Sequence, residues 1–262
     1  MTKTSPIAVM DSGVGGISVL RELVQLMPQE DFYYFGDSHN APYGEKSTEA
    51  VRALTLAHAE RMFADGAKAL VVACNTATGA AIGALRERFP DRVVIGIEPA
   101  LKPAARSKNS PFVVVMATPL TLKQEKFEQL LAQYNSDARI CTLPCHGLVE
   151  MIERGITEGA ALTTHLQELF APLLGEQPDA VVLGCTHYPL VRDTIQAVVG
   201  ENVPLYDGGA GTARETRRRL AEAGLLREDT HVGVVTVENS ANDPTLIALC
   251  RDLLAKGAPC GG

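Results

Sequence analysis

The sequence contains no apolar run that approaches the roughly 18 residues needed to span a membrane. Its first apolar run, residues 6–10, is also too short for the hydrophobic region of a secretory signal peptide. Positive charge is scarce, because 24 Lys and Arg face 31 Asp and Glu and leave a net charge of −7. So few cations cannot neutralise many phosphates. We therefore expect a cytoplasmic protein that binds neither a membrane nor nucleic acid.

Two common nucleotide-binding motifs are missing as well. The glycine-rich turn at residues 11–16, DSGVGG, is not a G-x-G-x-x-G fingerprint, and no Walker A lysine follows it. This turn follows an apolar run and opens a helical pattern, so its glycines would let the backbone approach a ligand whose anionic group meets the helix N–H groups. Asp11 would repel a phosphate. A plain Asp/Ser helix cap is the alternative interpretation of this turn.

The overall composition is that of a globular protein. The 262 residues are 46% hydrophobic and 21% charged, which fits one large domain or two small ones. Short apolar runs alternate with helical patterns, and most of the runs are continuously apolar, as in parallel strands covered on both faces. This alternation predicts an α/β fold. The strands are expected at residues 7–10, 32–35, 69–73, 93–97, 112–116, 180–184, 203–206 and 231–237.

The chain also resembles itself. Residues 7–16 parallel residues 112–121, and ALVVACNTA at 69–77 parallels AVVLGCTHY at 180–188. We therefore predict two pseudo-symmetric, Rossmann-like lobes with mainly parallel sheets and the active site in the cleft between them. The expected lobes are residues 1–98 plus 207–262, and residues 99–206. Functional groups gather at the carboxyl ends of parallel strands, so the two parallel motifs should face each other across the cleft.

Six cysteines remain to be explained, and in a cytoplasmic chain of this size each is buried, metal-bound or catalytic. Cys74 and Cys185 each end an apolar run at the start of a helix, where a thiolate is stabilised by the helix dipole. Cys141, Cys145 and His146 have a spacing seen in zinc sites, but no second compact pair follows them, so we expect no metal. Cys250 lies on an apolar helix face and is expected in the core, and Cys260 is expected to have no role.

Two thiols that face each other across a bound carbon form a base on one side and an acid on the other. Removal of a proton from one face and delivery to the opposite face inverts the stereocentre. Each thiol needs a nearby group that tunes its proton affinity. We expect Asp11 to serve Cys74, and Glu150 or His187 to serve Cys185.

These motifs, together with the Pro42-Tyr43-Gly44 loop, resemble glutamate racemase from about residue 7 to residue 220. The resemblance implies an isomerase that interconverts L- and D-glutamate without a cofactor. It implies D-glutamate supply for peptidoglycan, and so for cell-wall biogenesis and cell shape. Glutamate is then the ligand, and a homodimer is the expected assembly.

The resemblance also assigns roles to residues at matching positions. The implied catalytic residues are Cys74, Cys185, Asp11, Glu150 and His187. Asp11 and His187 also match substrate-binding positions, together with Ser12, Pro42, Tyr43, Gly44, Asn75, Thr76, Thr118, Thr121 and Thr186. The segment at residues 117–121 departs from the family pattern, because Leu120 replaces a glycine.

Three alternatives stay open. Aspartate racemase of the same superfamily differs mainly after the second cysteine, where a Glu is usual and this chain has His187. A non-catalytic binding protein would make both cysteines dispensable. A redox or zinc protein would use several of the six cysteines, and metal analysis would reveal it.

Overall fold

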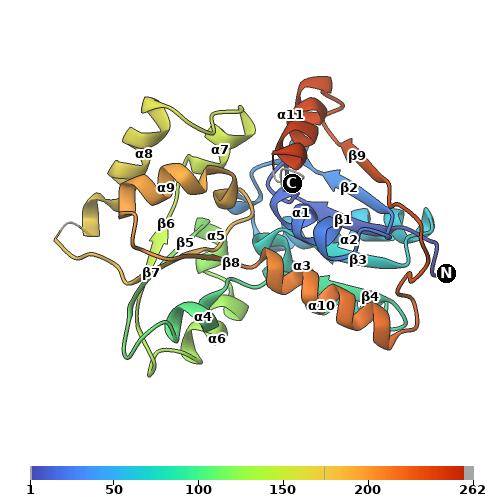
Figure 1. Ribbon diagram of the computed structural model, residues 1–262, viewed down its shortest axis with the longest axis horizontal. Coiled ribbons are helices and arrows are strands. Elements are labelled where there is room, and N and C mark those ends of the chain that lie inside the picture. Colours follow the sequence, from blue (N-terminus) through green and yellow to red (C-terminus); the bar gives the residue numbers. More distant parts are fainter. Residues whose placement is uncertain (1, 174, 257–262) are drawn as a thin grey trace.

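The computed structural model describes residues 2–173 and 175–256 and shows two α/β lobes (Figure 1). The first lobe contains a parallel sheet in the order β4-β3-β1-β2-β9, and the second contains a parallel sheet in the order β6-β5-β7-β8. The strands are β1 (Ile7–Asp11), β2 (Phe32–Gly36), β3 (Ala69–Val72), β4 (Val93–Gly96), β5 (Phe112–Ala117), β6 (Arg139–Pro144), β7 (Ala180–Leu183), β8 (Leu205–Asp207) and β9 (Val235–Asn239).

Helices connect the strands in both lobes. The α-helices are α1 (Ile17–Leu26), α2 (Thr48–Ala64), α3 (Asn75–Arg88), α4 (Leu101–Ala105), α5 (Pro119–Leu122), α6 (Glu125–Ala132), α7 (Leu148–Glu153), α8 (Ala160–Phe170), α9 (Arg192–Val199), α10 (Gly209–Glu222) and α11 (Pro244–Ala255). Short 3-10 helices are η1 (Ser38–Asn40), η2 (Tyr43–Glu45), η3 (Ala171–Leu173) and η4 (Tyr188–Val191).

The two sheets have the same internal order, as the likeness within the sequence predicts. When β1 is matched with β5 and β3 with β7, the order β4-β3-β1-β2 in the first lobe becomes β8-β7-β5-β6 in the second. Strand β9 is an addition at the edge of the first sheet. The prediction of an α/β fold with two related parallel sheets is therefore confirmed.

The apolar runs are continuous because each strand packs on both of its faces. In β1, Ile7 and Val9 belong to one hydrophobic cluster, whereas Ala8 and Met10 belong to another on the opposite face. The same alternation divides the residues of β5 between two clusters. Such burial on both sides is the usual environment of strands in parallel sheets.

Two strands differ from the expectation. β6 was not predicted, because this edge strand is half polar and most of its residues are partly or fully exposed. β9 begins at Val235, four residues later than the predicted run. Residues 231–234 instead form a connection in which His231 and the Val234 amide bind Asp31.

The chain passes between the lobes twice and returns to the first one. After β8, helix α10 packs against α1 and lies beside β4 in the first lobe (Figure 1). Asp207 still pairs with Leu183 in the second sheet, so the chain leaves that sheet one residue later than expected. The exact lobe boundaries remain a prediction. Within residues 2–173 and 175–256, no helix is long and apolar enough to cross a membrane.

Candidate active site

Cys74 stands at the carboxyl end of β3 and caps the N-terminus of α3. Its Sγ accepts a hydrogen bond from the Ala77 amide at 3.4 Å and lies 3.6 Å from the Ser12 hydroxyl. The side chain is 5% exposed. Burial, and then the charge of Asp11, raise the pKa of the Cys74 thiol to about 12, so the stabilising effect of the helix N-terminus is outweighed. The raised pKa favours the protonated form of the Cys74 thiol at neutral pH.

Cys185 occupies the matching place at the end of β7 and has a different helper. Its Sγ lies 3.7 Å from Nδ1 of His187, and both residues are buried. Burial alone would lower the pKa of His187, but its contacts with Cys185 and Glu153 outweigh burial and raise the pKa well above its usual range. The raised pKa favours the protonated form of His187.

The carboxylate that contacts His187 is Glu153, which the sequence analysis did not select. Oε1 of Glu153 lies 2.6 Å from Nε2 of His187, so the imidazole is held between a carboxylate and Cys185. Burial alone would raise the pKa of Glu153, but His187 and the Val14 amide outweigh burial and lower it. Glu150 lies one turn earlier on α7, where it lines a cavity of about 220 Å³ beside Pro42.

The two thiols belong to one site. The Thr186 hydroxyl donates to Oδ2 of Asp11 at 3.0 Å, which joins the turn after Cys185 to the turn beside Cys74. Burial raises the pKa of Asp11, and His187 and the Thr186 hydroxyl oppose this effect. The predicted grouping of Asp11, Ser12 and the two cysteine motifs is thus present in the structure.

The glycine-rich turn after β1 receives side chains from the other lobe. A Cβ on Gly13 would lie 1.9 Å from Oε1 of Glu153, and a Cβ on Gly15 would lie 2.3 Å from Nδ1 of His187. The Val14 amide donates to Glu153 at 2.7 Å. The anion that this turn binds is therefore the protein's own carboxylate.

Three threonine hydroxyls form a triangle between the lobes. Thr76 at the start of α3 lies 3.0 Å from Thr118 and 2.9 Å from Thr121, and the last two are 2.9 Å apart. Gly44 packs against the same cluster, because a Cβ there would lie 2.6 Å from the Thr118 Cβ. These predicted substrate-binding positions therefore lie together, on segments that are far apart in the sequence.

The Pro42-Tyr43-Gly44 loop is anchored from behind by a buried carboxylate. The Tyr43 hydroxyl donates to Oδ2 of Asp37 at 2.6 Å, and Nε2 of His58 lies 2.9 Å from the same oxygen. Burial and the neighbouring Asp37 raise the pKa of Tyr43, which keeps its hydroxyl a neutral donor. The hydroxyl thus holds the loop in place through Asp37.

Asn75, next to Cys74, keeps a free acceptor. Its side chain is buried, and its Oδ1 has no hydrogen-bond partner among the described residues. A buried polar atom without a partner is costly, so such an atom at a site indicates a ligand group that completes it. An ammonium group would do so.

The other described cysteines have no hydrogen bond to the residues of this site. Cys250 is fully buried in the core, Cys145 is buried and donates to the Leu143 carbonyl, and Cys141 is partly exposed on β6. Across residues 2–173 and 175–256, no group of three or more His, Cys, Asp and Glu is placed to hold a metal ion. Cys260 lies outside the described residues.

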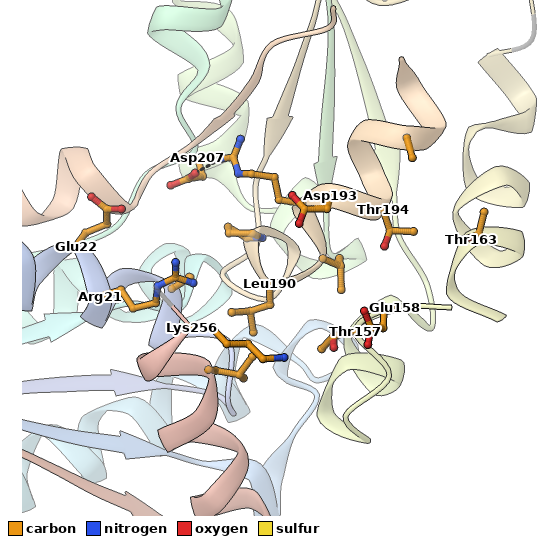
Figure 2. A pocket seen from close by; sticks show the side chains of 16 residues that line it. Arg21, Glu22, Thr157, Glu158, Thr163, Leu190, Asp193, Thr194, Asp207 and Lys256 are labelled. Carbon is orange, nitrogen blue, oxygen red and sulfur yellow. Dashed lines mark hydrogen bonds and ion pairs between the residues drawn. The ribbon is translucent and has the colours of Figure 1, made fainter. Parts of the chain in front are cut away.

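Residues of both lobes line a second cavity of about 650 Å³ (Figure 2). Arg21 of α1 and Lys256 at the end of α11 come from the first lobe, and Glu158 and Asp193 come from the second. Its wall includes Ser18, whose hydroxyl donates to the Thr186 carbonyl at 2.8 Å. None of the described cysteines lines this cavity.

The chain is thus an α/β protein of two like lobes, with one buried thiol at the equivalent strand end of each lobe. Residues 7–216 match the family described as Asp/Glu/Hydantoin racemase, and the chain belongs to this family. It is 46% identical over 252 residues to a glutamate racemase of Clostridium botulinum, a match that covers 96% of this chain and 98% of the relative. A glutamate racemase of Clostridium perfringens is equally similar, with 97% of its length covered.

Solved structures show the same architecture. The glutamate racemase of Francisella tularensis in complex with D-glutamate superposes with a TM-score of 0.84 at 26% identity, over 97% of this chain and 94% of that one. The Escherichia coli glutamate racemase in complex with L-glutamate and the activator UDP-MurNAc-ala gives a TM-score of 0.83 at 32% identity, with 95% of each chain covered. The racemase fold is therefore common to this chain and to both of these structures.

Proposed function

We propose that this protein is a glutamate racemase, an isomerase that interconverts L- and D-glutamate by proton transfer between Cys74 and Cys185. The observation that carries the proposal is the pair of buried thiols at equivalent strand ends, each with its own helper. Asp11 lies beside Cys74, and the His187–Glu153 pair lies beside Cys185. The close sequence similarity to glutamate racemases over nearly the whole chain supports glutamate as the substrate.

The reaction needs one ionised and one protonated thiol at a time. The thiolate takes the α-proton and becomes a thiol, the resulting carbanion accepts a proton from the opposite thiol, and that thiol becomes the thiolate. No atom is gained or lost, and the charge moves from one side of the site to the other. The differing surroundings of the two cysteines set the starting state, with Cys74 protonated and an imidazolium beside Cys185.

The substrate groups find complementary partners nearby. Asn75 offers its free Oδ1 to the ammonium group, and the threonine triangle and the backbone of the Tyr43-Gly44 loop offer donors to a carboxylate. Donors fixed in advance stabilise charge better than mobile water does. Pro42, Ser12 and Thr186 are further proposed substrate contacts.

Incubation of the purified, cofactor-free protein with each L-amino acid in D2O tests the substrate and the reaction. We expect deuterium at the α-carbon of glutamate and formation of the D-enantiomer. Faster exchange into aspartate would favour an aspartate racemase of the same superfamily. Activity that needs added pyridoxal phosphate would contradict the cofactor-independent mechanism.

Serine variants test the two thiols. We expect Cys74→Ser and Cys185→Ser each to lower kcat by roughly 100- to 10,000-fold, because general acid–base catalysis contributes about that much and a hydroxyl is a poor base. Circular dichroism should show both variants folded. Full activity in either would contradict the two-thiol mechanism and leave a non-catalytic binding role open.

The setting of the reaction follows from the proposed activity. D-glutamate made in the cytoplasm would supply peptidoglycan synthesis and so support cell-wall biogenesis and cell shape. A homodimer is the expected assembly, and light scattering of the purified protein measures it directly.

A further inference from the structure

Ser38, which lies outside the predicted set of site residues, touches the carboxylate that holds His187. Its Oγ lies 2.9 Å from Oε2 of Glu153, while the other carboxylate oxygen binds His187 at 2.6 Å. Ser38 opens η1 in the first lobe, whereas Glu153 and His187 belong to the second lobe. The contact therefore crosses the cleft.

A buried amide fixes the direction of the Ser38 hydroxyl. The Asn239 Nδ2 lies 2.9 Å from the Ser38 Oγ, and the Asn239 Oδ1 accepts a hydrogen bond from the Ala241 amide at 2.9 Å. The second bond sets the orientation of the side-chain amide, so its NH2 group must face Ser38. An amide nitrogen only donates and a hydroxyl has a single proton, so the Ser38 proton must point at Glu153.

These contacts form one chain of hydrogen bonds. It runs from Asn239 at the end of β9 through Ser38 and Glu153 to His187, and ends at Cys185. Asn239 is 1% exposed, so water does not compete for its amide. The carboxylate has little freedom to turn, because the Val14 amide binds the same oxygen as His187.

We propose that Ser38, with its hydroxyl oriented by Asn239, is a positioning residue that holds Glu153 in place and thereby keeps His187 directed at Cys185. Ser38 acts on only one of the two thiols, since Cys74 has a separate helper in Asp11. The proposal deepens the glutamate racemase function and rests on it. Loss of the Ser38 hydroxyl should therefore slow the proton transfer at Cys185 more than the proton transfer at Cys74.

The experiment compares Ser38→Ala with Ser38→Thr, which keeps the hydroxyl, and with Ser136→Ala, a control on an exposed loop of the second lobe. We expect Ser38→Ala to lower kcat about tenfold, the lower end expected for loss of a hydrogen bond to a charged group. Ser38→Thr should restore most of the activity, and Ser136→Ala should match the unmodified protein. Wild-type kcat in Ser38→Ala would overturn the proposal.

Isotope effects distinguish a loss of positioning at Cys185 from a general loss of structure in the active site. Two enantiomers have equal free energies in water, so kcat/KM must fall by the same factor in both directions. With α-deuterated L- and D-glutamate, the primary isotope effect on kcat/KM should rise in the direction where Cys185 removes the deuteron. The isotope effect should fall in the other reaction direction, where Cys74 removes the deuteron. Equal changes in both directions would overturn the proposal.

Asn239→Asp provides a second variant if Ser38→Ala does not fold. It keeps the acceptor for the Ala241 amide but removes the donor, so the Ser38 proton is shared between two carboxylates. We expect the same opposed isotope effects, and their absence would count against the chain of hydrogen bonds. If the unmodified protein does not racemise glutamate, the proposed function itself fails. If the unmodified protein does racemise glutamate, and the Ser38 and Asn239 variants show the same kcat and isotope effects as the unmodified protein, only the proposed role of Ser38 fails.

Discussion

Glu153 and Glu150 are three residues apart on the same short helix, and only one of them reaches the imidazole. Residues three apart lie on the same side of a helix, so helical spacing does not distinguish them. The difference comes from the first lobe, where the Val14 amide and the Ser38 hydroxyl bind Glu153. A contact between segments about 140 positions apart leaves no local pattern in the sequence.

This assignment predicts unequal effects for two similar substitutions. We expect Glu153→Gln to lower kcat by roughly ten- to a hundredfold, because it weakens a charge-assisted bond to His187. Glu150→Gln, with no hydrogen bond to His187, should change kcat less than about twofold. Steady-state kinetics of the two variants give the comparison. A larger loss in Glu150→Gln would return the helper role to that residue.

Asp37 makes stability depend on pH through the loop that it anchors. Burial would raise its pKa, but His58 and the Tyr43 hydroxyl outweigh burial and lower it from 3.8 to about 2. The folded protein thus binds this proton more weakly than the unfolded chain does. The stabilisation is fully present above about pH 4 and is lost as the pH falls towards 2.

The size of this contribution can be measured. The shift corresponds to about 2 kcal/mol of the free energy of unfolding at neutral pH. We expect Asp37→Asn to lose about this amount at pH 7, and the gap to the unmodified protein to narrow between pH 4 and pH 2. Urea unfolding across this pH range gives the free energies. A gap that stays constant with pH would contradict the assignment.

Among the elements, the strands covered on both faces were predictable from the sequence. β1, β3 and β5 are continuously apolar because both of their faces are buried, and their predicted bounds differ from the structure by a residue at most. β6 has one exposed edge and carries Arg139 and Thr142, so its apolar signal is weak. The residues at the carboxyl ends of the strands were predictable for the same reason as the strands themselves.

A substitution in the turn after β1 tests how closely the two lobes must approach each other. We expect Gly15→Ala to lower kcat at least tenfold, because its Cβ would lie 2.3 Å from Nδ1 of His187 and the imidazole would have to move. Gly83→Ala is the matched control, since a Cβ there meets nothing within 4 Å. Within α3 that change should stabilise the protein by about 0.5–1 kcal/mol and leave kcat unchanged. Kinetics and thermal unfolding of both variants check these outcomes, and normal activity in Gly15→Ala would contradict the close approach.

For the whole molecule, the pseudo-symmetry in the sequence predicted the architecture and the equivalent positions of Cys74 and Cys185 in the two lobes. It did not predict how the lobes join, because a repeat within the sequence does not specify which residues of one lobe contact which residues of the other. Thr186 binds Asp11, Ser18 binds the Thr186 carbonyl, and Glu153 binds the turn after β1. These contacts depend on the relative position of two separately folded lobes.

A ligand that joins both lobes should stabilise the whole protein. In Cys74→Ser, where racemisation should be at least about 100-fold slower, saturation at 100 times Kd should add about 2.7 kcal/mol to the free energy of unfolding. At roughly 2–4 °C per kcal/mol, the midpoint of thermal unfolding should rise by roughly 5–10 °C. Glycine, which lacks the side-chain carboxylate, is the control. An equal shift with glycine would mean that the cleft does not recognise the second carboxylate.

Burial of both thiols has a consequence for turnover. Cys74 and Cys185 are 5% and 8% exposed, so we predict that a substrate reaches them only after the lobes separate. Such a separation would break the bonds from Glu153 to Val14 and Ser38, and closure would restore them with His187 already directed at Cys185. We therefore expect turnover to include a mechanical step, and the rate of product release to fall as the friction of the surrounding solvent rises.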